Sequence, residues 1–341
     1  MKKAGVALVG LGGWGATMSL PAITQAGNLE LITWFDANPE TVNQCKDKIP
    51  VPPAGSLDEV LDNPAVEGIV FIVPNHIHPQ LAIDAAGRGK HLWIEKPIAN
   101  TIAEADSMIQ ACEDAGVTLQ VGHSLRRNPG MRLIKKMIGE GKIGELATLE
   151  AHQSHRGGWT LTPEMWRWYD GKCPGGPLNL LGIHQIDNMH YLLGPSAEVT
   201  AMMAKKCLPC EIDEISHVII RFKNGLLGTI GDTYITPAKT FIAVYGTTGW
   251  LELNFLRNML TYFDIDGKPE GIPYTPINLI ADEFKEFGEC ILTGKRPETG
   301  GPEARAAVAV MEAAIESART SKAVQVRAQG PRLDEKGHSG T

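Results

Sequence analysis

Two short motifs carry side chains that can move a proton. Glu95-Lys96-Pro97 ends a predicted strand, where the carboxylate can accept from a ribose hydroxyl and the ammonium group can donate to a substrate oxygen. His184 and Asp187 lie three residues apart in a helix-compatible segment, so the carboxylate can orient or charge-stabilise the imidazole. Both motifs indicate acid–base chemistry on a hydroxyl group. The structural alternatives are a strand-end ion pair and a satisfied core histidine.

A glycine-rich segment near the N-terminus predicts a dinucleotide site. It follows the apolar run 6–9 and fits the pattern G-x-G-x-x-G. Gly10 permits a tight turn, Gly12 lets a pyrophosphate approach the backbone, and Gly15 lets the next helix pack closely. The loop expected to hold the phosphates comprises Gly10, Gly12, Gly13, Trp14 and Gly15.

Asp36 ends the next apolar run, about 20 residues after the last glycine, where a carboxylate accepts hydrogen bonds from the adenosine ribose. The same carboxylate would repel a 2′-phosphate, and no cation follows directly. We therefore expect NAD in preference to NADP, unless Lys46 or Lys48 folds back. An ordinary α/β turn with a helix-capping Asp36 is the alternative.

Other polar residues follow predicted strands, at the sheet edge where open α/β folds bind ligands. Pro74, Asn75 and His78 are expected on the cofactor side, although a helix cap alone would explain Asn75. His123 and Arg126 follow the last predicted strand of this region and are expected to line the substrate cleft.

The segment 155–178 is rich in glycine, proline and tryptophan, and loops of this length are usually functional. We expect it to cover the cleft. Its His155 and Trp166 are suited to binding a polyol, because an indole stacks on C–H bonds and an imidazole hydrogen-bonds to hydroxyls. His190, farther along the chain, is interpreted as structural.

Periodicity predicts two domains. Strands at 5–9, 30–35, 68–73, 91–94 and 117–121 alternate with helices at 14–26, 39–48, 76–88 and 101–115. This alternation predicts an α/β domain over residues 1–122 with a doubly wound parallel sheet, that is, a Rossmann fold. Residues 123–326 contain a run of strands between helices, which predicts an α+β domain with a largely antiparallel open sheet. Residues 327–341 form a polar tail.

Composition limits the class of protein. The 341 residues carry a net charge of −7, which argues against a nucleic-acid partner. No apolar run approaches the ~20 residues that span a bilayer. The six cysteines are scattered, and Cys207 and Cys210 form a C-x-x-C without a second pair. We therefore expect reduced thiols, no metal site, no membrane partner and a cytoplasmic location.

The motifs occur in the order of a known family. The glycine loop, Pro74-Asn75-x-x-His78, Glu95-Lys96-Pro97 and Gly182-x-His184-x-x-Asp187 resemble the family of glucose–fructose oxidoreductase, inositol dehydrogenase and MocA. The resemblance implies NAD(P)-dependent oxidation of a sugar or cyclitol hydroxyl. It further implies that Lys96 and His184 are the catalytic residues and that the Lys96–Pro97 peptide bond is cis.

One position departs from that family. Many members carry Asp four residues before the catalytic His, where this chain has Leu180. Asp187 is expected to support His184 from the other side, or Asn179 to bind substrate. The resemblance leaves three activities open: a dehydrogenase acting on a sugar, sugar acid or cyclitol, an NAD-dependent glycosidase that works by transient oxidation, and a non-catalytic binding protein. It also implies a homodimer or homotetramer formed through the second sheet.

Overall fold

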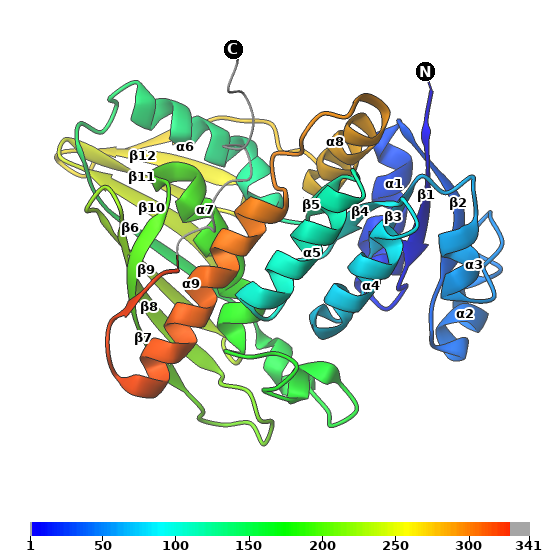
Figure 1. Ribbon diagram of the computed structural model, residues 1–341. Helices are drawn as coiled ribbons and strands as arrows, with labels where there is room; N and C mark the ends of the chain where they lie inside the picture. The colour runs from blue at the N-terminus through cyan, green and yellow to red at the C-terminus, as the bar shows by residue number, and fades with distance from the viewer. Residues whose placement is uncertain (1, 328–341) are drawn as a thin grey trace, which may run out of the picture.

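The computed structural model describes residues 2–327, so nearly all of the predicted polar tail lies outside the described residues. The N-terminal half contains a five-stranded, wholly parallel sheet in the order β2-β1-β3-β4-β5 (Figure 1). This confirms the doubly wound α/β prediction. The strands are β1 (Ala4–Val9), β2 (Leu29–Phe35), β3 (Gly68–Phe71), β4 (His91–Ile94) and β5 (Leu119–Val121).

Short helices connect these strands, and several begin where capping side chains predict. Ser56 accepts a hydrogen bond from the Glu59 amide, and Thr101 forms a reciprocal capping box with Glu104. A π-helical turn (Gly15–Ser19) precedes the first α-helix, which makes the predicted helix at 14–26 irregular at its start. The helices are α1 (Leu20–Ala26), α2 (Pro39–Cys45), α3 (Leu57–Asp62), α4 (His78–Ala86) and α5 (Ile102–Asp114).

The second sheet has nine strands in the order β13-β12-β11-β10-β6-β9-β8-β7-β14. Only the β6–β9 pair is parallel, which confirms the largely antiparallel prediction. The predicted run of strands corresponds to β6 through β11, whereas β12, β13 and β14 were not predicted. The strand bounds are β6 (Leu146–Ser154), β7 (Ser196–Ala204), β8 (Ile215–Phe222), β9 (Leu227–Thr233), β10 (Lys239–Gly246), β11 (Gly249–Asn254), β12 (Met259–Asp264), β13 (Pro269–Ile272) and β14 (Val324–Gln325).

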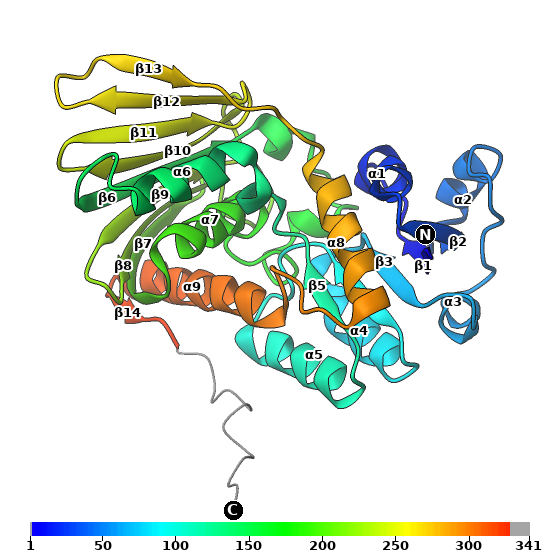
Figure 2. The ribbon, with the colours of Figure 1, turned by 90° about the horizontal axis from the view of Figure 1, so that it is seen from above.

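One face of this sheet is covered by helices and the other is open (Figure 2). The covering helices are α6 (Pro129–Gly139), α7 (Ile183–Leu193) and α9 (Gly301–Thr320). Strand β8 shows the resulting alternation, because Val218 and Ile220 are buried whereas His217 and Ile219 are exposed. No helix of the described chain is long and apolar enough to cross a membrane.

Helix α8 (Leu279–Thr293) packs on the first sheet, although the predicted division after residue 122 assigns it to the second domain. It lies beside α1 in both ribbon views (Figures 1 and 2). Phe284 and Phe287 belong to the same apolar cluster as Leu8, and the rings of Phe284 and Trp93 are 4.9 Å apart in an edge contact. The chain therefore returns to complete the Rossmann layer.

Candidate active site

The carboxyl ends of the parallel strands bring the predicted motifs together. The strand order reverses at β1, and in open α/β sheets the ligand crevice lies at that reversal. The glycine loop follows β1, Asp36 follows β2, Pro74 follows β3, Lys96 follows β4 and His123 follows β5. The fold thus places these segments along one edge.

The glycine loop distinguishes glycines that the fold requires from glycines that face open space. A Cβ on Gly10 would lie 2.2 Å from the Ile72 carbonyl oxygen, and one on Gly15 would lie 2.1 Å from the Gly10 oxygen. Gly10 also has a φ of +91°, a conformation that L side chains rarely adopt. A Cβ on Gly12 or Gly13 would meet no protein atom within 4 Å. The loop therefore fits a dinucleotide pyrophosphate approaching at Gly12.

Asp36 joins the loop to the second strand. Its carboxylate accepts hydrogen bonds from the Leu11 amide at 2.7 Å and from the Asn38 amide at 2.8 Å. Each oxygen retains a lone pair for a ribose hydroxyl. Lys46 and Lys48 are exposed, and neither forms an ion pair with Asp36 among the described residues.

Glu95 and Lys96 lie at the centre of the edge. The Glu95 carboxylate accepts from the Lys96 amide at 3.1 Å and from the Trp14 indole. Burial raises the pKa of Glu95 and lowers that of Lys96, and the opposite charge of each neighbour resists both shifts. The Lys96–Pro97 peptide bond is cis, as predicted.

The ammonium group of Lys96 meets a backbone carbonyl where the family pattern supplies a carboxylate. Its Nζ donates to the Leu180 oxygen at 2.7 Å. Leu180 lies in a π-helical turn (Leu178–Gly182) that runs directly into α7, the helix of His184. The two predicted catalytic residues are therefore linked through one short segment of backbone.

Three buried amides secure that segment to the Rossmann layer. The Asn100 oxygen accepts from Asn75 at 2.7 Å and from Asn179 at 3.2 Å, and Asn75 also donates to Asn179 at 3.0 Å. The Asn100 amide donates to the Lys172 carbonyl at 3.1 Å. The side chain of Asn179 is therefore committed to this cluster rather than to substrate. Asn75 makes no side-chain helix cap, so that alternative is wrong.

Asn100 was missed by the sequence analysis. Its position in the loop after Pro97, at the same sheet edge, was the available signal. His78 was assigned to cofactor, but it is buried and bonded to backbone. Its Nδ1 lies 3.1 Å from both the Pro97 and Ile98 oxygens, and Nε2 lies 3.1 Å from the Val73 oxygen. His78 therefore connects the loops that follow β3 and β4 through hydrogen bonds to their backbone oxygens.

Asp187 does not contact His184 directly, contrary to the helix-spacing expectation. Its carboxylate binds the Arg126 guanidinium through two bonds, 2.8 Å to Nε and 2.5 Å to a terminal nitrogen. Arg126 is therefore committed to this pair rather than to substrate. His123 is fully buried, and its Nδ1 lies 3.8 Å from Asp187. The rings of His123 and His184 are 6.5 Å apart at 88°.

The segment 155–178 consists of two short 3₁₀ helices (Arg156–Thr160 and Trp166–Trp168) joined by turns, and its two predicted site residues have the following partners. His155 accepts from the Gly157 amide at 2.9 Å and packs edge-on to Tyr234. Burial lowers the His155 pKa, with Lys96 and Arg167 adding to the effect. Trp166 lies 6.0 Å from His76 and stacks with the Arg167 guanidinium at 4.7 Å.

His190 has a structural partner, which confirms its interpretation. Its Nε2 is 2.8 Å from the Ser196 hydroxyl, and burial lowers its pKa to about 4. All six cysteines are unpaired. The described residues contain no group of three or more His, Cys, Asp or Glu that could hold a metal ion.

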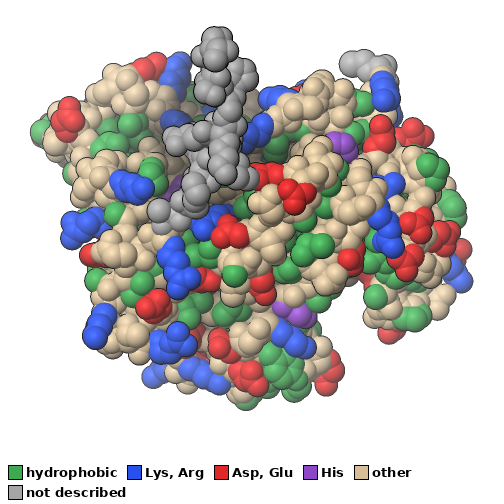
Figure 3. Space-filling model, viewed as in Figure 1, with side chains coloured by type: hydrophobic (Ala, Val, Ile, Leu, Met, Phe, Trp, Pro, Cys, Tyr) green, Lys and Arg blue, Asp and Glu red, His purple; other side chains and the backbone are tan. Residues whose placement is uncertain are grey.

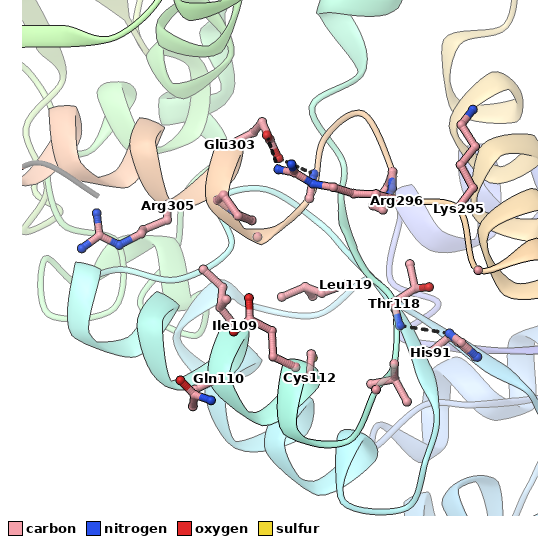
Figure 4. Close-up of a pocket in the computed structure, with 18 of the residues that line it drawn as sticks. His91, Ile109, Gln110, Cys112, Thr118, Leu119, Lys295, Arg296, Glu303 and Arg305 are labelled. Atoms are coloured by element: carbon pink, nitrogen blue, oxygen red, sulfur yellow. Dashed lines mark hydrogen bonds and ion pairs between the residues drawn. The ribbon is translucent and has the colours of Figure 1, made fainter. Parts of the chain in front are cut away.

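A separate cavity of about 800 Å³ lies away from these residues, between α5 and the start of α9 (Figure 4). Arg296 pairs with Glu303 at 2.6 Å and Arg305 pairs with Asp106 at 2.5 Å, so its arginines are neutralised locally. Nothing in its lining selects a ligand chemistry, and the motifs at the sheet edge remain the candidate site.

Comparison with known proteins identifies relatives for the whole described architecture. Residues 4–123 match the family model of an oxidoreductase family with an NAD-binding Rossmann fold, and residues 131–252 match the GFO/IDH/MocA C-terminal domain. A crystal structure described as an NADPH-dependent oxidoreductase from Desulfitobacterium hafniense is 28% identical, with a TM-score of 0.90, and covers 96% of this chain and 98% of its own.

Two curated relatives are similar over part of their length. The 2,7-anhydro-N-acetylneuraminate hydratase of Escherichia coli is 28% identical over 72% of this chain and 66% of its own. The levoglucosan dehydrogenase of Pseudarthrobacter phenanthrenivorans is 28% identical over 58% of each chain. The matched segments therefore span less than two thirds of these relatives.

Proposed function

The chain belongs to the Gfo/Idh/MocA oxidoreductase family, and we propose that it transfers a hydride between a secondary hydroxyl of a sugar, sugar acid or cyclitol and NAD. One observation carries the proposal. The Lys96 ammonium is bound to Leu180, in the turn that leads into His184, at the edge where the glycine loop and Asp36 also lie. A cationic donor and an imidazole are thus held beside a dinucleotide site.

Lys96 and His184 have different roles in the proposed oxidation of an alcohol. Lys96 donates a hydrogen bond to the substrate oxygen and stabilises the negative charge that develops there. Nε2 of His184 accepts the hydroxyl proton. Bound NAD supplies the hydride acceptor. Because burial lowers the His184 pKa well below 6.5, its imidazole is neutral at physiological pH and ready to accept that proton.

The cofactor would be held by groups that remain open in the described chain. Gly12 and Gly13 face open space, and each oxygen of Asp36 retains a lone pair for the ribose. Trp14 and Glu95, joined to each other, border the same loop. The Asp36 carboxylate, which has no ion pair with Lys46 or Lys48 in the described chain, favours NAD over NADP.

The alternative activity is elimination by transient oxidation, and a hydratase of an anhydro-sugar is among the relatives. An enzyme that oxidises transiently, acidifies a neighbouring C–H bond and eliminates a leaving group would use the same Lys96 and His184. Such an enzyme regenerates NAD within each turnover. A non-catalytic binding protein on this fold would have no need of either side chain.

Net NADH formation separates these activities. Purified protein is mixed with NAD and a panel of sugars, sugar acids, inositols and anhydro-sugars, and absorbance of NADH is followed with product analysis. The dehydrogenase accumulates NADH with at least one substrate, whereas the transient oxidant forms product without net NADH. Absence of both with every class would contradict the proposed activity.

We also propose that the second sheet mediates self-association, as a homodimer or homotetramer. Its open face carries Met202, Ile219 and Met259, which are 80%, 49% and 45% exposed. Exposed apolar side chains gathered on one face are typical of an interface. We further propose a cytoplasmic location, because the six cysteines are unpaired and free thiols are typical of a reducing compartment.

Charge supports a small-molecule substrate rather than a nucleic acid. The net charge is −7, and acidic and basic side chains are interspersed over the face shown in Figure 3. A nucleic-acid partner would instead require a continuous basic surface.

A further inference from the structure

Three ring nitrogens beside the proposed base are buried without hydrogen-bond partners. They are Nδ1 of His184 and both nitrogens of His123. Buried polar atoms in folded proteins are nearly always paired, so three unpaired nitrogens on neighbouring rings need an explanation. One of them belongs to the proposed base and the other two to the ring next to it, which indicates a role in the proton chemistry of His184.

The spacing of the rings defines what can connect them. A direct hydrogen bond needs nitrogens about 3 Å apart, and rings whose centroids are 6.5 Å apart cannot make one. A single water, bonded to one nitrogen on each ring, spans such a gap. Nδ1 of His123 also lies 3.8 Å from Asp187, whose carboxylate Arg126 holds in place.

We propose that a buried water joins His184 to His123, so that His184, His123 and Asp187 form a proton relay. This inference rests on the proposed role of His184 as the base. It places His123 as a positioning residue that acts through His184, rather than as a substrate contact. It also gives Asp187 an indirect part in the support of His184, in place of the direct contact that its helical spacing suggested.

The protons balance along this path. Neutral His184 carries its proton on Nδ1 and donates it toward the water, which leaves Nε2 free. When Nε2 accepts the substrate hydroxyl proton, the Nδ1 proton moves to the water and the water passes one to Nε2 of His123. The positive charge then rests on His123, beside the Asp187 carboxylate. To reset the relay, the proton returns from His123 through the water to Nδ1 of His184, and Nε2 of His184 releases its proton to solvent in the cleft.

The charges around the relay determine in which direction His123 shifts the pKa of His184. Burial lowers the pKa of His123 to about 4, Asp187 opposes that shift, and Arg126 and Lys96 add to it. His123 is therefore neutral at rest and accepts the bond from the water. Burial, Lys96 and the charged form of His123 all lower the pKa of His184. At rest His123 is neutral, and the water held by its ring accepts a hydrogen bond from Nδ1 of His184, which stabilises protonated His184. Loss of His123 should therefore lower the pKa of His184 further.

The test is the pH profile of kcat/KM for alcohol oxidation in His123→Phe. This variant keeps an aromatic ring and removes both nitrogens. We expect kcat/KM to fall roughly 10–100-fold, less than the loss of the base itself, and the acid limb to move to lower pH. His190→Phe is the matched control, because it removes a partly buried imidazole from α7, the helix of His184, and should leave the limb in place. An unchanged limb in His123→Phe would overturn the relay.

A second measurement uses the unmodified protein and so does not depend on how the variant folds. Histidine side-chain ¹⁵N spectra report which nitrogen of each neutral ring carries the proton. The relay requires the Nδ1–H tautomer for both His184 and His123, and an Nε2–H tautomer for His184 would contradict it. If His184→Ala keeps full turnover, the base assignment fails. If it loses turnover while the His123→Phe profile is unchanged, only the relay fails.

Discussion

Lys96 is bound to a carbonyl dipole where the family pattern has a carboxylate, and this alters the charge it can offer. A carbonyl oxygen holds the ammonium in place without neutralising it. Glu95 is then the neighbouring carboxylate whose charge acts most strongly on it. In the proposed mechanism this cation stabilises a developing alkoxide, and Leu180 is compatible with that role.

Lys96→Met tests this role. The substitution keeps most of the aliphatic side chain and removes the charge, so turnover should fall roughly 10²–10³-fold, as for loss of one donor to a developing oxyanion. NADH affinity, measured by fluorescence titration, should change much less than turnover. Turnover within twofold of the unmodified protein would contradict the role given to Lys96.

The amide cluster makes a separate prediction about stability. Asn100→Ala leaves the Asn75 and Asn179 amide groups buried without their shared acceptor, and should lower the free energy of unfolding by about 1–3 kcal/mol. Denaturant unfolding measures the change. Asn43→Ala, on the exposed face of α2, is the control and should shift stability by no more than about 0.5 kcal/mol. Equal effects at both positions would show that the cluster contributes nothing.

At the scale of elements, two glycines of the loop are expected to matter for different properties: Gly15 for folding and Gly12 for binding NAD. Gly15→Ala forces a Cβ to within 2.1 Å of the Gly10 oxygen, so the variant should unfold at lower temperature and bind NAD poorly. Gly12→Ala meets open space, so its melting temperature should match that of the unmodified protein while its NAD affinity falls. Melting curves and calorimetric titration compare the two. Normal NAD affinity in Gly12→Ala would show that the pyrophosphate does not bind at this position.

Local patterns were sufficient to predict the parallel sheet and the glycine loop, because each depends on residues close in sequence. Strand β12 escaped prediction because it lies near the sheet edge, where most of its residues are half-exposed and alternation is weak. The position of α8 on the first sheet was not predicted, because an amphipathic pattern does not specify which sheet a helix covers.

The same limit applies to the candidate site. Asp187 and His184 are neighbours by helical spacing, yet Arg126, 61 residues earlier, holds Asp187 with two charged hydrogen bonds. Such a pair outweighs a helix-surface contact between neighbouring residues. Sequence motifs thus gave the residues that gather at the sheet edge, whereas their partners depend on contacts between distant segments.

At the scale of the whole molecule, the open sheet face predicts an oligomer. Sedimentation at micromolar concentration should find a dimer or tetramer, because a second copy covers the exposed apolar side chains. Ile219→Lys places a charge on that face and should shift the equilibrium toward monomer, whereas Ile83→Lys, at an exposed position of α4, should not. A monomer in the unmodified protein would contradict the interface.

The central claim is that His184 accepts the substrate proton in an NAD-dependent oxidation. The most direct test is steady-state turnover of His184→Ala beside His190→Ala, with NADH affinity measured for both. We expect His184→Ala to lose roughly 10²–10⁴ in kcat with nearly unchanged NADH affinity, and His190→Ala to lose far less. In the unmodified protein, oxidation should decline as pH falls through a pKa below 6.5, since protonated imidazole cannot accept the proton. Near-normal turnover in His184→Ala would contradict the account.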